Sequence, residues 1–367
     1  MKKVYVGMSG GVDSSVAAAL LVAQGCEVTG VFMKNWAQDL PGFKCPWRED
    51  LADAKRVAVQ LGIAFKVYDF QKEYKHAVVD YMIEEYKAGR TPNPDIMCNQ
   101  EVKFKLFLET ALEDGADMIA TGHYAKVSRS SEVGNSVQEN EHSESATHYS
   151  LKTATDDNKD QTYFLYRVTR EALSKTLFPL GDMLKPDVRK KAAELGLITA
   201  LKKDSVGICF VGEIGIKEFL QNFVITVPGD IIEKSSGKIL GKHEGALYYT
   251  IGQRHGLDVG GGLPYYVLGK DMDNNEVYVS TDLNDPYLWH KTVTIADVHW
   301  INEPPESVKD LTIRVRHRGP LIEVKKFQLK GENCYTLELK DEIRALAPGQ
   351  SAVLYQDDIC LGGGIIL

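Results

Sequence analysis

No long apolar segment occurs in this chain of 367 residues. The longest uninterrupted apolar run, Val16 to Ala23, is far shorter than the roughly 18 residues that a membrane-spanning helix needs. Met1-Lys2-Lys3 leads into a strand-like segment and not into the apolar region of a signal peptide. The composition, 44% hydrophobic and 26% charged, is ordinary for a globular protein. We therefore expect a cytosolic protein with no membrane partner.

Cysteine spacings typical of zinc sites are also missing. No two cysteines form a C-x-x-C pair, and a reducing compartment does not favour structural disulfides. The six cysteines are Cys26, Cys45, Cys98, Cys209, Cys334 and Cys360. We expect no protein-built metal site, and any functional cysteine acts as a thiol.

An excess of positive charge is lacking, because the net charge is −8. This argues against a diffuse surface for polyanions, so a nucleic acid must be held by local basic patches. Lys309 to Lys330 is such a patch, with seven Lys or Arg residues and two acidic ones. Within it Arg314, Arg316 and Arg318 alternate with other residues, which in a strand puts the arginines on one face. A solvated strand edge is the alternative.

A glycine-rich loop is the most informative feature. Ser9-Gly10-Gly11-Val12-Asp13-Ser14 follows the apolar segment Val4 to Met8 and precedes the helical segment Ser15 to Ala23. The loop has neither the lysine of G-x-x-x-x-G-K-[ST] nor the third glycine of G-x-G-x-x-G. A strand, a glycine turn and a helix start nevertheless form an anion cradle. We predict binding of a nucleoside triphosphate; an ordinary glycine turn is the alternative.

Alternating short apolar runs and helical patterns predict an α/β domain. We expect a doubly wound parallel sheet with ligands at the carboxyl ends of its strands. Met33 and Gly122 follow the second and fourth strands and are expected to line the adenine and ribose side, although Met33 alone is typical of a core. The predicted strands are Val4 to Met8, Glu27 to Met33, Ala64 to Phe70 and Asp117 to Thr121; the predicted helices are Ser14 to Gln24, Glu49 to Leu61, Lys72 to Tyr86 and Glu101 to Glu113.

Composition changes twice further along the chain. Residues from about 130 to 147 are rich in Ser, Glu and Asn and predict a mobile acidic insertion. After Phe219, glycine, proline and short strand patterns become frequent. We expect a catalytic domain at 1–218, a small β-rich domain at 219–285 and a C-terminal β-barrel-like domain at 286–367.

Several motifs together resemble one family, the tRNA-specific 2-thiouridylases, whose loop is the PP-loop of N-type ATP pyrophosphatases. The likeness covers nearly the whole chain; the acidic insertion and His255 depart from it. The motifs are Phe32 to Trp36, Asn93 to Asn99, Thr121 to Ala125, Lys159 to Leu165, Lys203 to Phe210 and Tyr249 to Arg254.

The resemblance implies a tRNA-uridine 2-sulfurtransferase, in which ATP adenylates the C2 oxygen of a wobble uridine and sulfur then replaces it. It implies that Cys209 carries a persulfide, that Cys98 is its partner in a transient disulfide, and that Asp95 is the acid or base. Position alone places Cys98 just before a helix capped by Asn99, which favours a thiolate. A buried core cysteine is the alternative for both thiols, and a turn-forming aspartate for Asp95.

The implied ligands are ATP, Mg²⁺, tRNA and a persulfide donor, either a cysteine desulfurase or a sulfur-relay protein. Asp13 is the candidate for orienting Mg²⁺; stabilisation of the helix start is the alternative. The ATP-binding candidates are Gly7, Met8, Ser9, Gly10, Gly11, Val12, Asp13, Ser14, Met33 and Gly122. The tRNA-binding candidates are Asn93, Pro94, Asp95, Lys159, Asp160, Gln161, Arg316 and His317.

Two other functions remain open at this point. An amide-forming synthetase with the same loop also adenylates a carbonyl, but it needs no pair of thiols. A non-catalytic tRNA-binding protein with ATP as a ligand would release no pyrophosphate.

Overall fold

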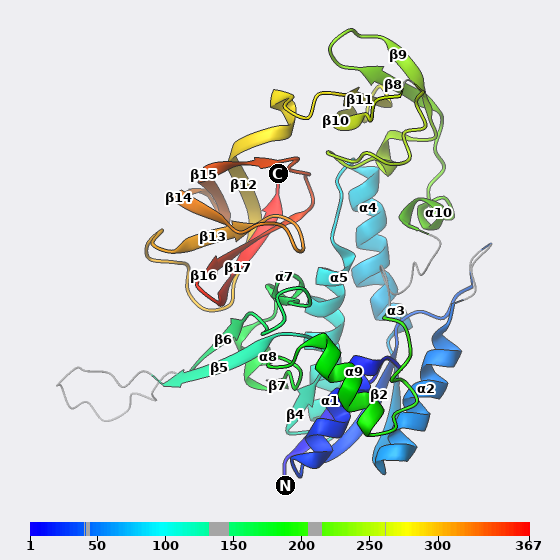
Figure 1. The fold of residues 1–367 in the computed structure, drawn as a ribbon, viewed down its shortest axis with the longest axis vertical. Coiled ribbons are helices and arrows are strands. Elements are labelled where there is room, and N and C mark those ends of the chain that lie inside the picture. The colour runs from blue at the N-terminus through cyan, green and yellow to red at the C-terminus, as the bar shows by residue number, and fades with distance from the viewer. Residues whose placement is uncertain (40, 42–44, 132–146, 205–214, 261) are drawn as a thin grey trace, which may run out of the picture.

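A parallel five-stranded sheet forms the centre of the N-terminal domain (Figure 1). The computed structural model describes residues 1–39, 41, 45–131, 147–204, 215–260 and 262–367. The strand order is β3-β2-β1-β4-β7, so the order reverses between β1 and β4. The strands are β1 (Lys3–Gly7), β2 (Glu27–Lys34), β3 (Ala64–Asp69), β4 (Met118–Ala120) and β7 (Thr176–Leu177).

Helices cover both faces of this sheet because its strands are apolar on both sides. In β1, Val4 and Val6 pack against one group of helices, and Tyr5 packs into the core on the other side. The first face carries α1 (Val12–Ala23), α2 (Trp47–Leu61) and α9 (Lys185–Glu194). The second carries α3 (Gln71–Tyr74), η1 (Lys75–Asp80), α4 (Tyr81–Lys87), α5 (Pro94–Met97), η2 (Cys98–Leu106) and α6 (Phe107–Glu113), where η1 and η2 are π-helical.

The middle region contains a four-stranded sheet in the order β10-β11-β8-β9. It lies at the far end of α4 from the parallel sheet (Figure 1). Its elements are α10 (Ile216–Leu220), β8 (Gly229–Glu233), β9 (Ile239–His243), the 3₁₀ turn η3 (Ala246–Tyr248), β10 (Tyr266–Asp271) and β11 (Glu276–Ser280).

The C-terminal region is an antiparallel barrel that closes where β12 pairs with β17. One end of β17 also pairs with the hairpin β5–β6 of the N-terminal domain, so one sheet joins the two domains. The barrel elements are the 3₁₀ turn η4 (Pro286–Leu288), β12 (Trp289–Trp300), β13 (Leu311–Arg314), β14 (Ile322–Gly331), β15 (Cys334–Arg344), β16 (Ser351–Gln356) and β17 (Ile359–Ile366); the joining elements are β5 (Lys126–Ser131), β6 (Thr147–Lys152), α7 (Thr162–Leu165) and α8 (Arg170–Ser174).

The predicted fold class is confirmed: a doubly wound parallel sheet precedes a small β-rich region and a β-barrel. One local prediction was wrong, and one element was not predicted. The segment Lys72 to Tyr86 is not one α-helix, because η1 interrupts it with π-helical turns. The hairpin β5–β6 was not predicted, because its two strands flank the segment from about 130 to 147 that was interpreted as an acidic insertion. No helix in the described part of the chain is long and apolar enough to cross a bilayer.

Candidate active site

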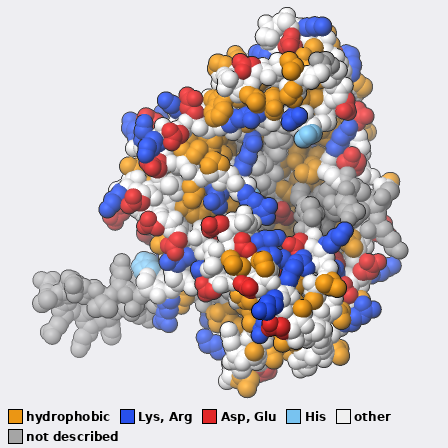
Figure 2. Space-filling model, viewed as in Figure 1, with side chains coloured by type: hydrophobic (Ala, Val, Ile, Leu, Met, Phe, Trp, Pro, Cys, Tyr) orange, Lys and Arg blue, Asp and Glu red, His pale blue; other side chains and the backbone are white. Residues whose placement is uncertain are grey.

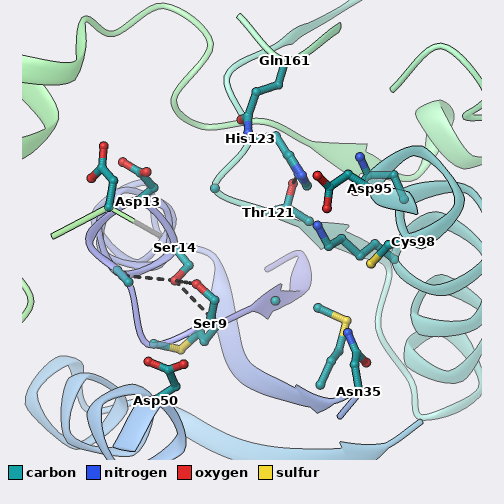
Figure 3. A pocket seen from close by; sticks show the side chains of 18 of the residues that line it. Ser9, Asp13, Ser14, Asn35, Asp50, Asp95, Cys98, Thr121, His123 and Gln161 are labelled. Carbon is teal, nitrogen blue, oxygen red and sulfur yellow. Dashed lines mark hydrogen bonds between the residues drawn. The ribbon is translucent and has the colours of Figure 1, made fainter. Parts of the chain in front are cut away.

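A cavity of about 500 Å³ opens at the carboxyl ends of β1, β2 and β4. This is where strand order reverses, the usual ligand position in an open α/β sheet. Figure 3 shows Ser9, Asp13 and Ser14 on one side of it, with Asp95 and Cys98 across from them. The predicted residues that line it are Gly7, Met8, Ser9, Gly11, Val12, Asp13, Ser14, Met33, Asp95, Cys98, Gly122, Lys159, Gln161 and His317.

The glycine-rich loop has the geometry of an anion cradle. Gly10 has a φ of 76° and does not line the cavity; a Cβ there would collide with the carbonyl oxygen of Asp50. The Ser14 hydroxyl accepts the N–H of Ser9 at 3.2 Å and donates to the carbonyl of Gly11 at 3.2 Å. The N-cap of α1, Gly11, supplies no side-chain cap. The first N–H groups of α1 are therefore left for a ligand, as in phosphate-binding helix starts.

Gly122 allows the loop after β4 to pack on this helix start. A Cβ on Gly122 would lie 2.7 Å from the backbone nitrogen of Ser14. Met33 lines the cavity from the end of β2, and a Cβ on Gly7 would lie 3.0 Å from its methyl carbon. Both glycines thus act through close packing beside the cradle.

Asp13 is held by two groups that the sequence did not reveal. Its carboxylate accepts hydrogen bonds from the Lys185 ammonium at 2.7 and 2.8 Å and from the Tyr124 hydroxyl at 2.9 Å. Lys185 also lies 2.8 Å from Asp204, which Lys159 contacts at 2.7 Å. Burial alone would raise the pKa of Asp204, but hydrogen bonds from Lys159 and Lys185 lower it to about 2. A charged network therefore joins α1, α9 and the Lys159 loop.

The thiol side of the cavity contains two titratable groups with opposite shifts. Burial raises the pKa of the Asp95 carboxyl, although the charge of Lys103 opposes this. Burial lowers the pKa of His123 well below its usual value, and Lys103 lowers it further. His123 Nδ1 lies 2.7 Å from the Thr121 hydroxyl. Burial therefore favours the uncharged imidazole of His123 at neutral pH.

The predicted helix start at Asn99 was wrong. The helix begins at Pro94 and continues through Cys98 in a π-helical segment, so Asn99 is not an N-cap. Asn99 is buried, and its amide donates to the carbonyl of Phe164 at 2.9 Å. Cys98 is 3% exposed and lines the cavity. Cys209, and most of the predicted insertion at 130–147, lie outside the described residues.

The structure brings only some of the tRNA-binding candidates to the cavity. Asp95, Lys159, Gln161 and His317 line it. Gln161 fixes the loop after β4, since its carbonyl oxygen accepts the N–H of Tyr124 at 2.9 Å. Burial lowers the pKa of His317 to about 4, and its ring lies 4.6 Å from that of Phe164. The two ring planes are inclined at 45° to each other, so the rings form an aromatic corner of the cavity.

Asn93, Pro94, Asp160 and Arg316 do not line the cavity. Asn93 donates to the Tyr163 hydroxyl at 3.4 Å, and Pro94 is buried. Asp160 is 3% exposed and accepts hydrogen bonds from Ala154 N–H and the Thr162 hydroxyl. The Asp160 carboxylate therefore serves packing between domains.

The predicted stripe of arginines on one strand face was wrong. β13 ends at Arg314, and Arg318 has a φ of 60°, so the alternation is broken by a turn. Arg314 points inward, 3.6 Å from Asp160. Arg316 donates to the backbone carbonyls of Ala345 and Ile251. Of the three, only Arg318 lines the cavity.

Three domain models match successive parts of the chain. They are a tRNA methyl transferase HUP domain at residues 2–213, a tRNA methyl transferase PRC-barrel domain at 217–281 and an aminomethyltransferase beta-barrel domain at 290–366. Their descriptions refer to methyl transfer, whereas the full-length relatives below are named for thiolation.

Full-length relatives align over the whole chain. A tRNA-specific 2-thiouridylase MnmA of Idiomarina loihiensis is 47% identical over 373 residues, which cover 100% of this chain and 96% of the relative. The same enzyme of Mesoplasma florum is 46% identical over 382 residues, covering 100% and 98%. A solved 4-thiouridine synthetase–RNA complex with bound ATP has a TM-score of 0.37 and 17% identity, covering 60% of this chain and 50% of that one. Because nearly half of all residues match along the full length, this protein belongs to the tRNA-specific 2-thiouridylase family.

Proposed function

We propose that this protein is a tRNA-uridine 2-sulfurtransferase that adenylates the C2 oxygen of a wobble uridine with ATP and then replaces it with sulfur. One observation carries the proposal: a single cavity holds a phosphate cradle at the end of β1 and, on its other side, the thiol of Cys98 beside Asp95. The C2 carbonyl of uracil is amide-like and therefore a poor electrophile. Its oxygen must become a leaving group before a sulfur nucleophile can displace it.

In the first step, the uridine C2 oxygen attacks the α-phosphorus of ATP, and pyrophosphate leaves. The loop Ser9 to Ser14 holds the β- and γ-phosphates through backbone N–H groups and the start of α1. Asp95 accepts or returns the uridine N3 proton, a role that its raised pKa favours. Phe164 and His317 both line the cavity with their planes at 45°, and the uracil stacks on one of these two rings.

In the second step, sulfur enters at C2. The outer sulfur of a persulfide on Cys209 bonds to C2, and AMP leaves with the electron pair of the C2–O bond. The Cys98 thiolate then attacks the Cys209 sulfur, which breaks the S–S bond and leaves 2-thiouridine and a Cys98–Cys209 disulfide. An external thiol reductant reduces this disulfide, and a cysteine desulfurase or sulfur-relay protein reloads the persulfide.

Mg²⁺ fits this cavity as an ion that enters bound to the triphosphate. Among the described residues, no group of three or more His, Cys, Asp or Glu side chains could hold a metal. Mg²⁺ needs only one or two carboxylates besides substrate phosphates and water. Asp13 is the carboxylate of the loop, and the ion would supply charge neutralisation there. We also propose that the reaction takes place in the cytosol.

Persulfide labelling of serine variants tests the function. Cys98→Ser and Cys209→Ser should each abolish 2-thiouridine formation in a purified assay while tRNA binding persists. Cys209→Ser should also lose the sulfur label received from a donor, whereas Cys98→Ser should keep it. Cys26→Ser is the matched control, because this half-exposed thiol does not line the cavity. Thiolation by both active-site variants would refute the assigned roles of the two thiols. ATP-dependent pyrophosphate release without any 2-thiouridine formation in the wild type would favour an amide-forming synthetase, which needs neither thiol.

A further inference from the structure

The π-helical segment η2 contains both Cys98 and Lys103. In η2, hydrogen bonds span five residues, as from the Phe107 N–H to the Val102 carbonyl. In an α-helix, residues five apart lie about 140° apart around the axis. In a π-helix the fifth residue lies about one turn further along the same side. Cys98 and Lys103 therefore share one side of η2, and both line the cavity.

Lys103 forms no salt bridge with any described residue. Of the other half-buried cations lining the cavity, Lys34 lies 3.4 Å from Asp69, and Lys159 lies 2.7 Å from Asp204. Within the described part of the chain, Lys103 has no acidic side chain within 4.0 Å. Two further cations, Lys203 and Arg318, line the cavity but are exposed. In Figure 2, Lys and Arg side chains gather around the hollow between the domains.

The groups whose pKa values Lys103 affects show which part of the cavity lies near its charge. Its charge acts on the Asp95 carboxyl of α5 and on the His123 imidazole beyond β4. These two groups and Cys98 lie together on the side of the cavity away from Ser9 and Ser14 (Figure 3). An anion placed there would meet the carboxyl of Asp95. A cation at this place lowers the cost of bringing a second negative group beside a carboxylate.

We propose that Lys103 binds the α-phosphate of the adenylated uridine. This rests on the proposed function, which puts the uridine beside Cys98 and the β- and γ-phosphates in the loop, so that the α-phosphate lies between them. During adenylation, the O2–P bond forms, the bond from the α-phosphorus to pyrophosphate breaks, and the phosphoryl oxygens carry negative charge next to the ammonium. During thiolation, the C2–O bond breaks, and AMP leaves with the electron pair as an anion at the same place.

Lys103→Met tests this proposal, with Lys105→Met as the matched control. Lys105 lies two residues further along η2 and pairs with Glu101 at 2.8 Å on the exposed side. Loss of one charged donor to a reacting phosphoryl group should lower kcat for tRNA-dependent pyrophosphate release by about 10²-fold to 10³-fold. The KM for ATP and the Kd for tRNA should change by less than about threefold, because the loop and the other domains hold both substrates.

Lys103→Arg should recover most of kcat, and Lys105→Met should keep it within about twofold. If Lys103→Met does not fold, as judged by its unfolding transition, Lys103→Gln replaces it with the same expectation. A wild-type kcat for pyrophosphate release in Lys103→Met overturns the proposal, even if thiolation is lost, since Lys103 would then act on a thiol. An equal loss in Lys105→Met also overturns it. Absence of tRNA-dependent pyrophosphate release in the wild type refutes the proposed function itself.

Discussion

Replacing Lys185 by Met removes the cation that joins Asp13 of the loop to Asp204. Lys185 is 10% exposed in its side chain, and its ammonium lies 2.7 Å and 2.8 Å from the two carboxylates. Met has a similar length, so the volume of the site changes little. What changes is charge: two carboxylates that share one ammonium are left facing each other.

The loss of folding stability in Lys185→Met depends on which partners the two carboxylates keep. Asp204 keeps Lys159 at 2.7 Å and Arg189 at 2.6 Å, whereas Asp13 keeps only the Tyr124 hydroxyl. Breaking a buried ion pair by removing one partner costs about 3–5 kcal/mol. Both carboxylates are 31% exposed, so water reduces the penalty, and we expect about 3 kcal/mol. For a domain of this size that corresponds to a fall in Tm of about 6–12 °C.

Calorimetry and pyrophosphate release measure the two consequences. The midpoint temperature of the first unfolding transition should be about 6–12 °C lower in Lys185→Met than in the wild type. The rate of pyrophosphate release should fall at least about tenfold, because Asp13 loses its orientation. Lys191→Met on the same helix is the control, because Lys191 is 42% exposed and lies 3.8 Å from Glu194. Its stability should change by less than about 0.5 kcal/mol. Equal stability of the two variants would refute the reasoning.

Three further predictions concern the loop, a carboxylate and the arginines. Ser9→Ala and Asp13→Ala should each reduce tRNA-dependent pyrophosphate release by about 10²-fold in a folded protein, and normal turnover in both would contradict the loop assignment. The pKa of Asp204 is lowered from 3.8 to about 2, so ionised Asp204 adds about 2 kcal/mol to the free energy of unfolding above pH 4, and this contribution is lost as the pH falls toward 2. In urea unfolding, the free energy of unfolding of Asp204→Asn should therefore fall less steeply between pH 4 and pH 2 than that of the wild type. The same pH dependence in both proteins would contradict the lowered pKa. Arg318→Ala should reduce the slope of log K for tRNA binding against log salt concentration by about 0.7–0.9. Arg314 pairs with Asp160 inside the protein, so Arg314→Ala should lower stability without changing this slope. Equal slopes in the wild type and Arg318→Ala would show that Arg318 contacts no phosphate.

Local sequence was enough to predict the phosphate cradle and the sheet that carries it. The cradle depends on consecutive residues, since the turn needs Gly10 at a positive φ and the helix starts directly after Gly11. The two-sided apolar strands indicate parallel pairing, which brings the loop after β4 beside the loop after β1. Gly122 could therefore be assigned to this place before its contact with Ser14 was seen.

The start of the Cys98 helix was missed although a signal for it exists. Pro94 stands at the first helical position with Asp95 in the first turn, and both are typical of a helix N-terminus. Starting the helix at Asn99 assumed α-helical periodicity from Glu101 onward. The π-helical turns of η2 break that periodicity. The same turns place Lys103 on the side of Cys98, which a 3.6-residue period does not predict.

Charge pairs between distant elements explain why a basic sequence pattern is a poor guide to where an anion binds. Lys185 meets Asp13 across 172 residues of sequence, and Arg314 meets Asp160 across the boundary between barrel and sheet. Such a pair neutralises a cation that composition alone counts as available to RNA. Only the fold shows which cations line the cavity without such a pair among the described residues; these include Lys103, on the side of Asp95 and Cys98, and Arg318 of the barrel patch.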